Sequence, residues 1–128
     1  TLSHQMMAIS DTELRKYVGW AVKNGFIPAI TIKNLDLSNM DFQGADLRDL
    51  VFINCTLTNT SWKRTRLTNC KFIKSNLDNS VFKLGRYNNV AFEECEMSEM
   101  IFEDSACIGV RVDKPVSGNP KYLRTLVR

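Results

Sequence analysis

The side chains best suited to catalysis or metal binding in this chain are four cysteines and one histidine. They are Cys55, Cys70, Cys95, Cys107 and His4. The cysteines form no CxxC pair, whereas a zinc site needs ligands at closer spacing or more ligand candidates. His4 has no carboxylate or serine at a spacing typical of a catalytic pair, and there is no Gly-rich phosphate loop or nucleophile motif. The sequence therefore predicts no catalytic residue, no metal site and no cofactor, and we expect the protein not to be an enzyme.

A five-residue period explains where the cysteines stand. A large apolar residue, or Cys107 in one case, recurs at every fifth position without any charged residue among them. These positions hold Ile32, Leu37, Phe42, Leu47, Phe52, Leu57, Trp62, Leu67, Phe72, Leu77, Phe82, Tyr87, Phe92, Met97, Phe102, Cys107 and Val112. The positions two residues earlier are all small or apolar, and three of the cysteines stand there. Cysteine at such an inward position behaves as a small hydrophobic residue, so we interpret all four as structural.

Two inward and three outward positions in each five fit neither an α-helix nor a simple strand. They fit a short extended segment followed by a tight turn. Asparagine ends seven of the fives, which favours a turn with positive φ at that position. Four such sides make a square coil of about 20 residues, and successive coils stack at the spacing of paired strands, about 4.8 Å.

This pattern resembles the pentapeptide-repeat family, whose motif approximates A(D/N)LXX. ADLRD at 45–49 and SNLDN at 75–79 match it closely, and the resemblance covers residues 30–112. It implies an all-β solenoid, a right-handed quadrilateral β-helix, here of about four coils. Leucine alternates with phenylalanine or tryptophan from position 37 to 82, which places aromatic residues on two opposite sides of the coil and aliphatic residues on the other two. Tyr87, Met97 and Cys107 depart from this pattern on the aliphatic sides. The predicted structural core is Leu37, Phe42, Leu47, Phe52, Leu57, Trp62, Leu67, Phe72, Leu77, Phe82, Phe92 and Phe102.

Both ends of a stacked coil need caps, because their backbone groups are unpaired. Residues 1–29 are predicted to form an N-terminal segment with a capping helix over 11–24. Ser10 and Glu13 form a capping box, the apolar stripe is Leu14, Tyr17, Val18, Ala21 and Val22, and Gly25 ends the helix. Residues 113–128 are interpreted as a C-terminal cap or linker, with KYLRTLVR forming a short closing helix or the start of a link to another domain.

The outward positions carry charge in bands. Residues 34–50 and 91–105 are rich in Asp and Glu, whereas residues 51–90 are rich in Lys and Arg. One coil apart, Lys63 stacks on Lys83 and Arg66 on Arg86, and an apolar pair, Ile53 and Ile73, stacks on another side. These six residues are the candidate partner surface. Two alternatives remain open: charge balance between coils for the basic residues, and ordinary β-preference for the apolar ones.

A rigid, non-catalytic protein-interaction module or scaffold is the function that this pattern favours. The resemblance adds that such β-helices occur in larger bacterial proteins, including effectors delivered to host cells. It also supplies the alternative, a DNA mimic that binds gyrase as in the quinolone-resistance branch. A basic middle interrupts the continuous acidic surface that mimicry needs.

The partner is therefore expected to be another protein of unknown identity, and a homodimer stays open. Nucleic acid is disfavoured, because the aromatic residues that could stack on bases point inward. Net charge is only +3, and no apolar run approaches the length of about 20 residues that spans a bilayer. We expect a soluble chain, in the cytoplasm or delivered into a host cell rather than in a membrane.

Overall fold

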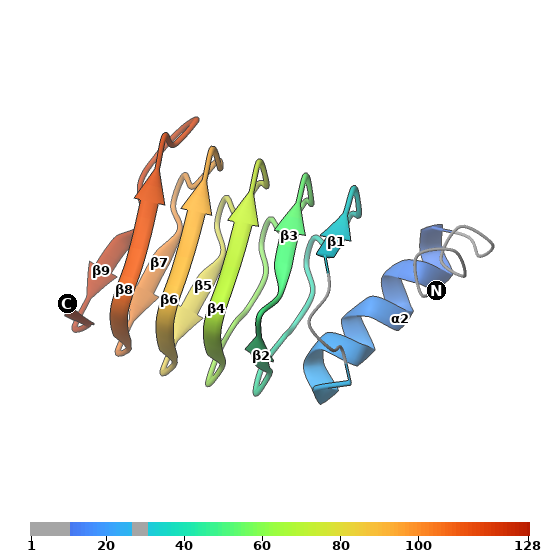
Figure 1. Cartoon of the computed structure of the whole chain (residues 1–128), viewed down its shortest axis with the longest axis horizontal. Coiled ribbons are helices and arrows are strands. Elements are labelled where there is room, and N and C mark those ends of the chain that lie inside the picture. Colours follow the sequence, from blue (N-terminus) through green and yellow to red (C-terminus); the bar gives the residue numbers. More distant parts are fainter. Residues whose placement is uncertain (1–10, 27–30) are drawn as a thin grey trace.

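A stack of short strands forms the body of the molecule, with one helix across its N-terminal end. The computed structural model describes residues 11–26 and 31–128. Figure 1 shows helix α2 at one end of the stack and the C-terminus at the other. The elements are α2 (Asp11–Asn24), β1 (Thr31–Lys33), β2 (Asp46–Arg48), β3 (Val51–Ile53), β4 (Arg66–Ile73), β5 (Val81–Lys83), β6 (Arg86–Glu93), β7 (Ile101–Glu103), β8 (Ala106–Asp113), β9 (Lys121–Leu123) and β10 (Leu126–Val127).

The strands pair in parallel with the residues one coil further along the chain. Thr31 lies opposite Val51, and Lys71 lies opposite Ala91. A residue with positive φ stands at every fifth position from 34 to 114, at corners occupied by asparagine, glycine and other residues. Twenty residues in each coil and a corner every five residues give four sides. The predicted β-helix with an N-terminal helix is confirmed, and it has about five turns.

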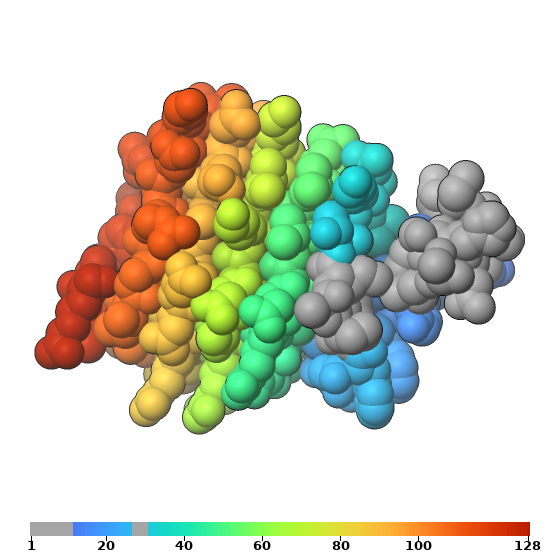
Figure 2. Space-filling view, viewed as in Figure 1, coloured from blue at the N-terminus to red at the C-terminus, as the bar shows by residue number. Residues whose placement is uncertain are grey.

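We number the four sides in chain order from residue 31. The first side pairs β1, β3 and the second halves of β4, β6 and β8, and the third side pairs β5, β7 and β9. The fourth side pairs β2, the first halves of β4, β6 and β8, and β10. The second side is held by single bridges from Asp36 through Thr56 and Asn76 to Glu96. Figure 2 shows successive coils as diagonal bands along the rod, so a band of the sequence becomes a band of the surface.

The core is a column of large side chains along the axis. All twelve residues of the predicted core are at most 2% exposed. On the first side the ring of Phe72 stacks on Phe52 and on Phe92, with centroids 4.9 Å apart in both pairs. On the opposite, third side Trp62 stacks on Phe82 at 5.4 Å. Inward phenylalanine and tryptophan therefore occupy two opposite sides, as the alternation predicts, whereas the buried Tyr87 lies on the fourth side.

Helix α2 covers the first coil with part of its predicted stripe. Val18, Ala21 and Val22 are fully buried, but Tyr17 is 43% exposed, so its place in the buried stripe is wrong. Tyr17 stands one residue before Val18 and lies at the edge of the covered face. Gly25, at φ 72, ends the helix: its amide donates to Val22, and the next amide donates to Ala21. This is a Schellman motif. Ser10 of the predicted capping box lies outside the described residues.

The coil continues beyond Val112, the last residue of the predicted repeat, because β9 and β10 pair with β7 and β8. Tyr122 stacks on Phe102 with ring centroids 5.3 Å apart and an interplanar angle of 6°. The expected closing helix over KYLRTLVR is therefore wrong, because its inward residues recur at the period of the coil and its backbone finds partners in the preceding coil.

Candidate functional site

The apolar pair of the candidate surface lies on the first side. Ile53 and Ile73 face each other directly between β3 and β4. Both are half-buried, and the same column holds Lys33 before them and Glu93 after them. The apolar part of this column therefore consists of two residues, with a charged residue before it and another after it.

The basic candidates meet at the corner between the third and fourth sides. Arg66 lies opposite Arg86 in the β4–β6 pairing. Lys63 and Lys83 lie side by side, since the amide after Lys63 donates to the carbonyl of Lys83 at 2.8 Å. That amide belongs to Arg64, which occupies the corner at φ 56 and is exposed. We call Lys63, Arg64, Arg66, Lys83 and Arg86 the basic corner.

Carboxylates in the coils before and after the basic corner form ion pairs with other cations. Asp46, opposite Arg66 in the preceding coil, lies 3.9 Å from Arg48. Glu103 and Asp104 in the following coil each lie 2.7 Å from Arg124. The hydrogen bond from Arg124 is the main reason why the pKa of Asp104 lies below its usual value.

No ion pair within residues 11–26 and 31–128 includes a residue of the basic corner. The charge of Lys83 nevertheless contributes to lowering the pKa of Asp104 in the following coil, so charge balance between coils acts on this lysine without a direct ion pair.

The structure does not bring the two candidate sets together. Ile53 and Ile73 stand next to the corner between the first and second sides, whereas the basic corner joins the third and fourth. These two corners are diagonally opposite in a four-sided coil. A small partner therefore contacts one set or the other, and the six candidate residues make two surfaces.

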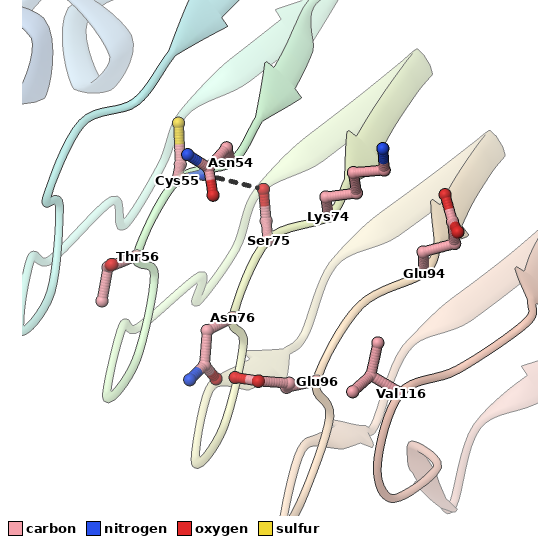
Figure 3. A pocket seen from close by; sticks show the side chains of 9 residues that line it. All are labelled: Asn54, Cys55, Thr56, Lys74, Ser75, Asn76, Glu94, Glu96 and Val116. Carbon is pink, nitrogen blue, oxygen red and sulfur yellow. Dashed lines mark hydrogen bonds between the residues drawn. The ribbon is translucent and has the colours of Figure 1, made fainter.

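A shallow groove runs beside the Ile53–Ile73 pair, across the corner between the first and second sides. Its volume is about 490 Å³, and Figure 3 shows side chains of successive coils along it. The lining residues are Asn54, Cys55, Thr56, Lys74, Ser75, Asn76, Glu94, Glu96 and Val116. The amide of Cys55 donates to the hydroxyl of Ser75 at 3.1 Å, drawn as a dashed line. The groove is polar and carries charges of both signs.

The cysteine thiols are buried and point into the coil. The thiol of Cys55 donates to the carbonyl of Ile32 at 3.4 Å, and that of Cys95 donates to Phe72 at 3.2 Å. Burial raises the pKa of Cys55 and Cys70, and raises that of Cys95 and Cys107 to about 11. A protonated, enclosed thiol is neither a nucleophile nor a ready metal ligand.

Within residues 11–26 and 31–128, no group of three or more His, Cys, Asp or Glu side chains is arranged to hold a metal ion. His4 lies outside these residues. No helix in the same ranges is long and apolar enough to cross a membrane.

Sequence reasoning missed two contacts that shape the ends of the stack. Arg124 clamps Glu103 and Asp104, and the guanidinium of Arg15 on α2 donates to the carbonyl of Ser38. Arg124 stands 20 residues after Asp104, so extending the period past Val112 would have found this pair. The Arg15 contact has no such signal, because it depends on how the helix lies on the coil.

Comparison with known proteins agrees with the geometry. The family described as pentapeptide repeat region matches residues 45–113, which is more than half of the chain. No curated protein matches it. The repeat, the corner every five residues and this match lead to one conclusion: the chain belongs to the pentapeptide-repeat family.

Proposed function

We propose that this chain is a non-catalytic protein-interaction module that presents fixed surfaces on a rigid stack. The observation that carries the proposal is the basic corner, whose five cations make no ion pair with the described residues. Lys83 still feels the carboxylates of the following coil, since its charge helps to lower the pKa of Asp104. Cations held close together without a direct ion pair cost free energy through repulsion, which an acidic partner relieves. The buried, protonated thiols support a role without covalent chemistry.

The rigidity of the coil also supports this role. The buried side chains of successive coils form one continuous core, and adjacent coils are paired through their backbones. The backbone positions of surface residues on such a scaffold are held in register, so little ordering of the backbone is needed when a partner binds. A module of this kind binds by presenting a preformed surface.

The alternative of a gyrase-binding DNA mimic finds less support. Mimicry needs an acidic surface that runs without interruption along the rod. The second and third coils instead present Lys63, Arg66 and their neighbours between two acidic bands. A mimic would lose its charge pattern at the middle of the rod.

The experiment is a capture of binding partners from a cell lysate with crosslinking, in which folded surface variants are compared with the wild type. One variant combines Ile53→Asp with Ile73→Asp, and another combines Lys63→Glu with Lys83→Glu. The control combines Thr58→Asp with Ser98→Asp, which adds two carboxylates at half-buried outward positions of the second side. We expect a specific protein that the wild type and the control retain and that one surface variant loses.

A set of captured proteins that is the same for the wild type and all variants would contradict the proposal. Salt then identifies the surface. Binding through the basic corner weakens as ionic strength rises through the range where the Debye length falls from about 10 Å to about 3 Å, whereas binding through the isoleucine pair does not.

A further inference from the structure

Two turns of similar composition lie directly on top of each other at the corner between the third and fourth sides. One reads Lys-Arg-Thr-Arg (63–66), and the next reads Lys-Leu-Gly-Arg (83–86). The amide of Arg86 donates to the carbonyl of Thr65 at 3.0 Å, which holds the turns in register. Each turn therefore ends one side with a lysine and begins the next side with an arginine.

The corner is braced from inside. The hydroxyl of Thr65 donates to the carbonyl of Trp62 at 2.8 Å and lies 3.2 Å from the hydroxyl of Tyr87. Gly85 leaves the space that the Tyr87 hydroxyl fills, since a Cβ there would lie 2.0 Å from it. Burial raises the pKa of Tyr87 to about 12, so the phenol stays protonated in this brace. The cations project from a backbone that is fixed in place.

The basic band is narrow. It spans two coils, about 10 Å at the spacing of paired strands. Asp46 borders it on one side and Glu103 with Asp104 on the other. A membrane surface extends far beyond this band, and the major groove of a nucleic-acid duplex, about 12 Å wide, already exceeds it. Either would bring phosphates against these carboxylates. A single extended peptide that crosses the rod along the direction of the coils fits the band.

An apolar side chain stands among the cations. Leu84 occupies the corner of the second turn, is 41% exposed and has φ 56. An apolar residue in this exposed place contributes contact area beside the guanidinium groups. Arginine binds carboxylates in a two-point arrangement, so the corner combines carboxylate recognition with one apolar contact.

From these observations we propose that the basic corner binds an extended acidic segment of a partner protein, with carboxylates on Arg66 and Arg86 and an apolar side chain on Leu84. This inference rests on the proposed function and adds the chemistry of the partner. The bound segment lies across two coils and leaves the Ile53–Ile73 pair on the far corner uncovered.

The test measures fluorescence anisotropy of a labelled peptide in which glutamates flank one central phenylalanine. The corner variant combines Arg66→Glu with Arg86→Glu. The matched control combines Lys71→Glu with Lys74→Glu, which makes the same change of net charge on the first side and its corner with the second side, away from the basic corner. We expect the corner variant to weaken binding roughly tenfold or more and the control to weaken it less than about threefold. Leu84→Asn is expected to weaken binding of this peptide more than that of a peptide with serine in place of the phenylalanine. Circular dichroism verifies that each variant is folded.

Equal weakening by the corner variant and the control would show a net-charge effect and overturn the proposal, as would failure of the peptide to bind the wild type. Tighter binding of a short DNA duplex or of anionic phospholipid vesicles would overturn it in favour of that partner. If the peptide fails while the wild type still captures a protein through Ile53 and Ile73, the interaction module stands and only this assignment falls.

Discussion

Individual residues carry a conformational cost at the corners of this coil. Each corner needs positive φ, which asparagine adopts readily and other side chains adopt at a cost. Asn34 and Asn54 both adopt positive φ. They are also hydrogen-bonded to each other, since Nδ2 of Asn54 donates to Oδ1 of Asn34 at 2.8 Å. The next position in the same column is Lys74, at φ 49. Lysine adopts positive φ less readily than asparagine and cannot continue the hydrogen bonds between asparagine side chains, so this corner is strained.

Replacing that lysine should stabilise the protein. Lys74→Asn relieves the strain and extends the asparagine column by one coil, so we expect a gain of about 0.5–1 kcal/mol in the free energy of unfolding. Equilibrium unfolding in urea measures it. Lys71→Asn is the control, because Lys71 is an exposed residue in the extended part of β4. A gain with Lys71→Asn as large as with Lys74→Asn would mean that the corner is not the cause.

At the scale of elements, the segment between β8 and β9 shows how the coil absorbs an irregularity. Ser117 pairs with Glu96, which is one residue out of step with the pairings before it. Lys121 then pairs with Ile101, and the step of one coil is restored. The correction takes place at Gly118, whose φ is 69 and whose Cα lies against the backbone of the preceding coil. Only glycine combines that conformation with that closeness.

Gly118→Ala should therefore destabilise the end of the coil. The added Cβ would lie 2.7 Å from the amide nitrogen of Ser98. Gly109→Ala is a matched control, because Gly109 has φ 67 but its nearest backbone atom would lie 3.7 Å away. We expect Gly118→Ala to cost about 1–3 kcal/mol more than Gly109→Ala in urea unfolding. Equal costs would show that strain in φ, and not contact with the preceding coil, decides the effect.

The whole molecule is a one-dimensional stack, so a residue's contribution depends on its distance from the ends. Phe72 is fully buried and stacks on a ring on each side. Tyr122, in the last coil, is 41% exposed and stacks on one ring only. In such stacks stability is approximately the sum of each coil and its contacts with neighbours. Removing a ring from the middle therefore affects two interfaces, and removing one from the end affects one.

Phe72→Ala should cost about 3–5 kcal/mol, because it leaves an axial cavity that the rigid coil cannot close. Tyr122→Ala should cost about 1 kcal/mol, since its ring is half in solvent already. Both are measured by equilibrium unfolding, with Val116→Ala, in the exposed loop, as a control for truncation without a buried cavity. A wild-type midpoint for Phe72→Ala would contradict the inward position of this residue.

Much of the fold follows from the local pattern of the chain. The five-residue period predicts which residues face inward. The seven asparagines at the ends of the fives mark corners, and all seven have positive φ in the structure. Charged residues at the same corners, such as Arg64 and Glu94, give no such signal. Their conformation is imposed by pairing with adjacent coils. Residues 113–119 do not follow the five-residue period, so the period does not predict the last coil. That coil is identified by its pairing with the preceding one.

The sequence predicts which candidate residues stack on one another, but not which charged groups around them form ion pairs. Stacking of Arg66 on Arg86 follows from the 20-residue coil. The ion pairs around these arginines cannot be predicted in the same way. Glu103 and Asp104 pair with Arg124, which belongs to a coil beyond the repeat that the sequence shows.

The coil, its inward residues, its N-terminal helix and the order of its charge bands are all readable from the amino-acid sequence. They follow from local spacing, because two inward positions recur in every five residues and the helix has its own apolar stripe. The end of the coil, the carboxylates that form ion pairs, and the placement of the apolar pair and the basic corner at opposite corners are set by the tertiary structure. Those features depend on contacts between residues about one coil or more apart, where the geometry of stacking, and not the neighbouring sequence, sets which groups meet.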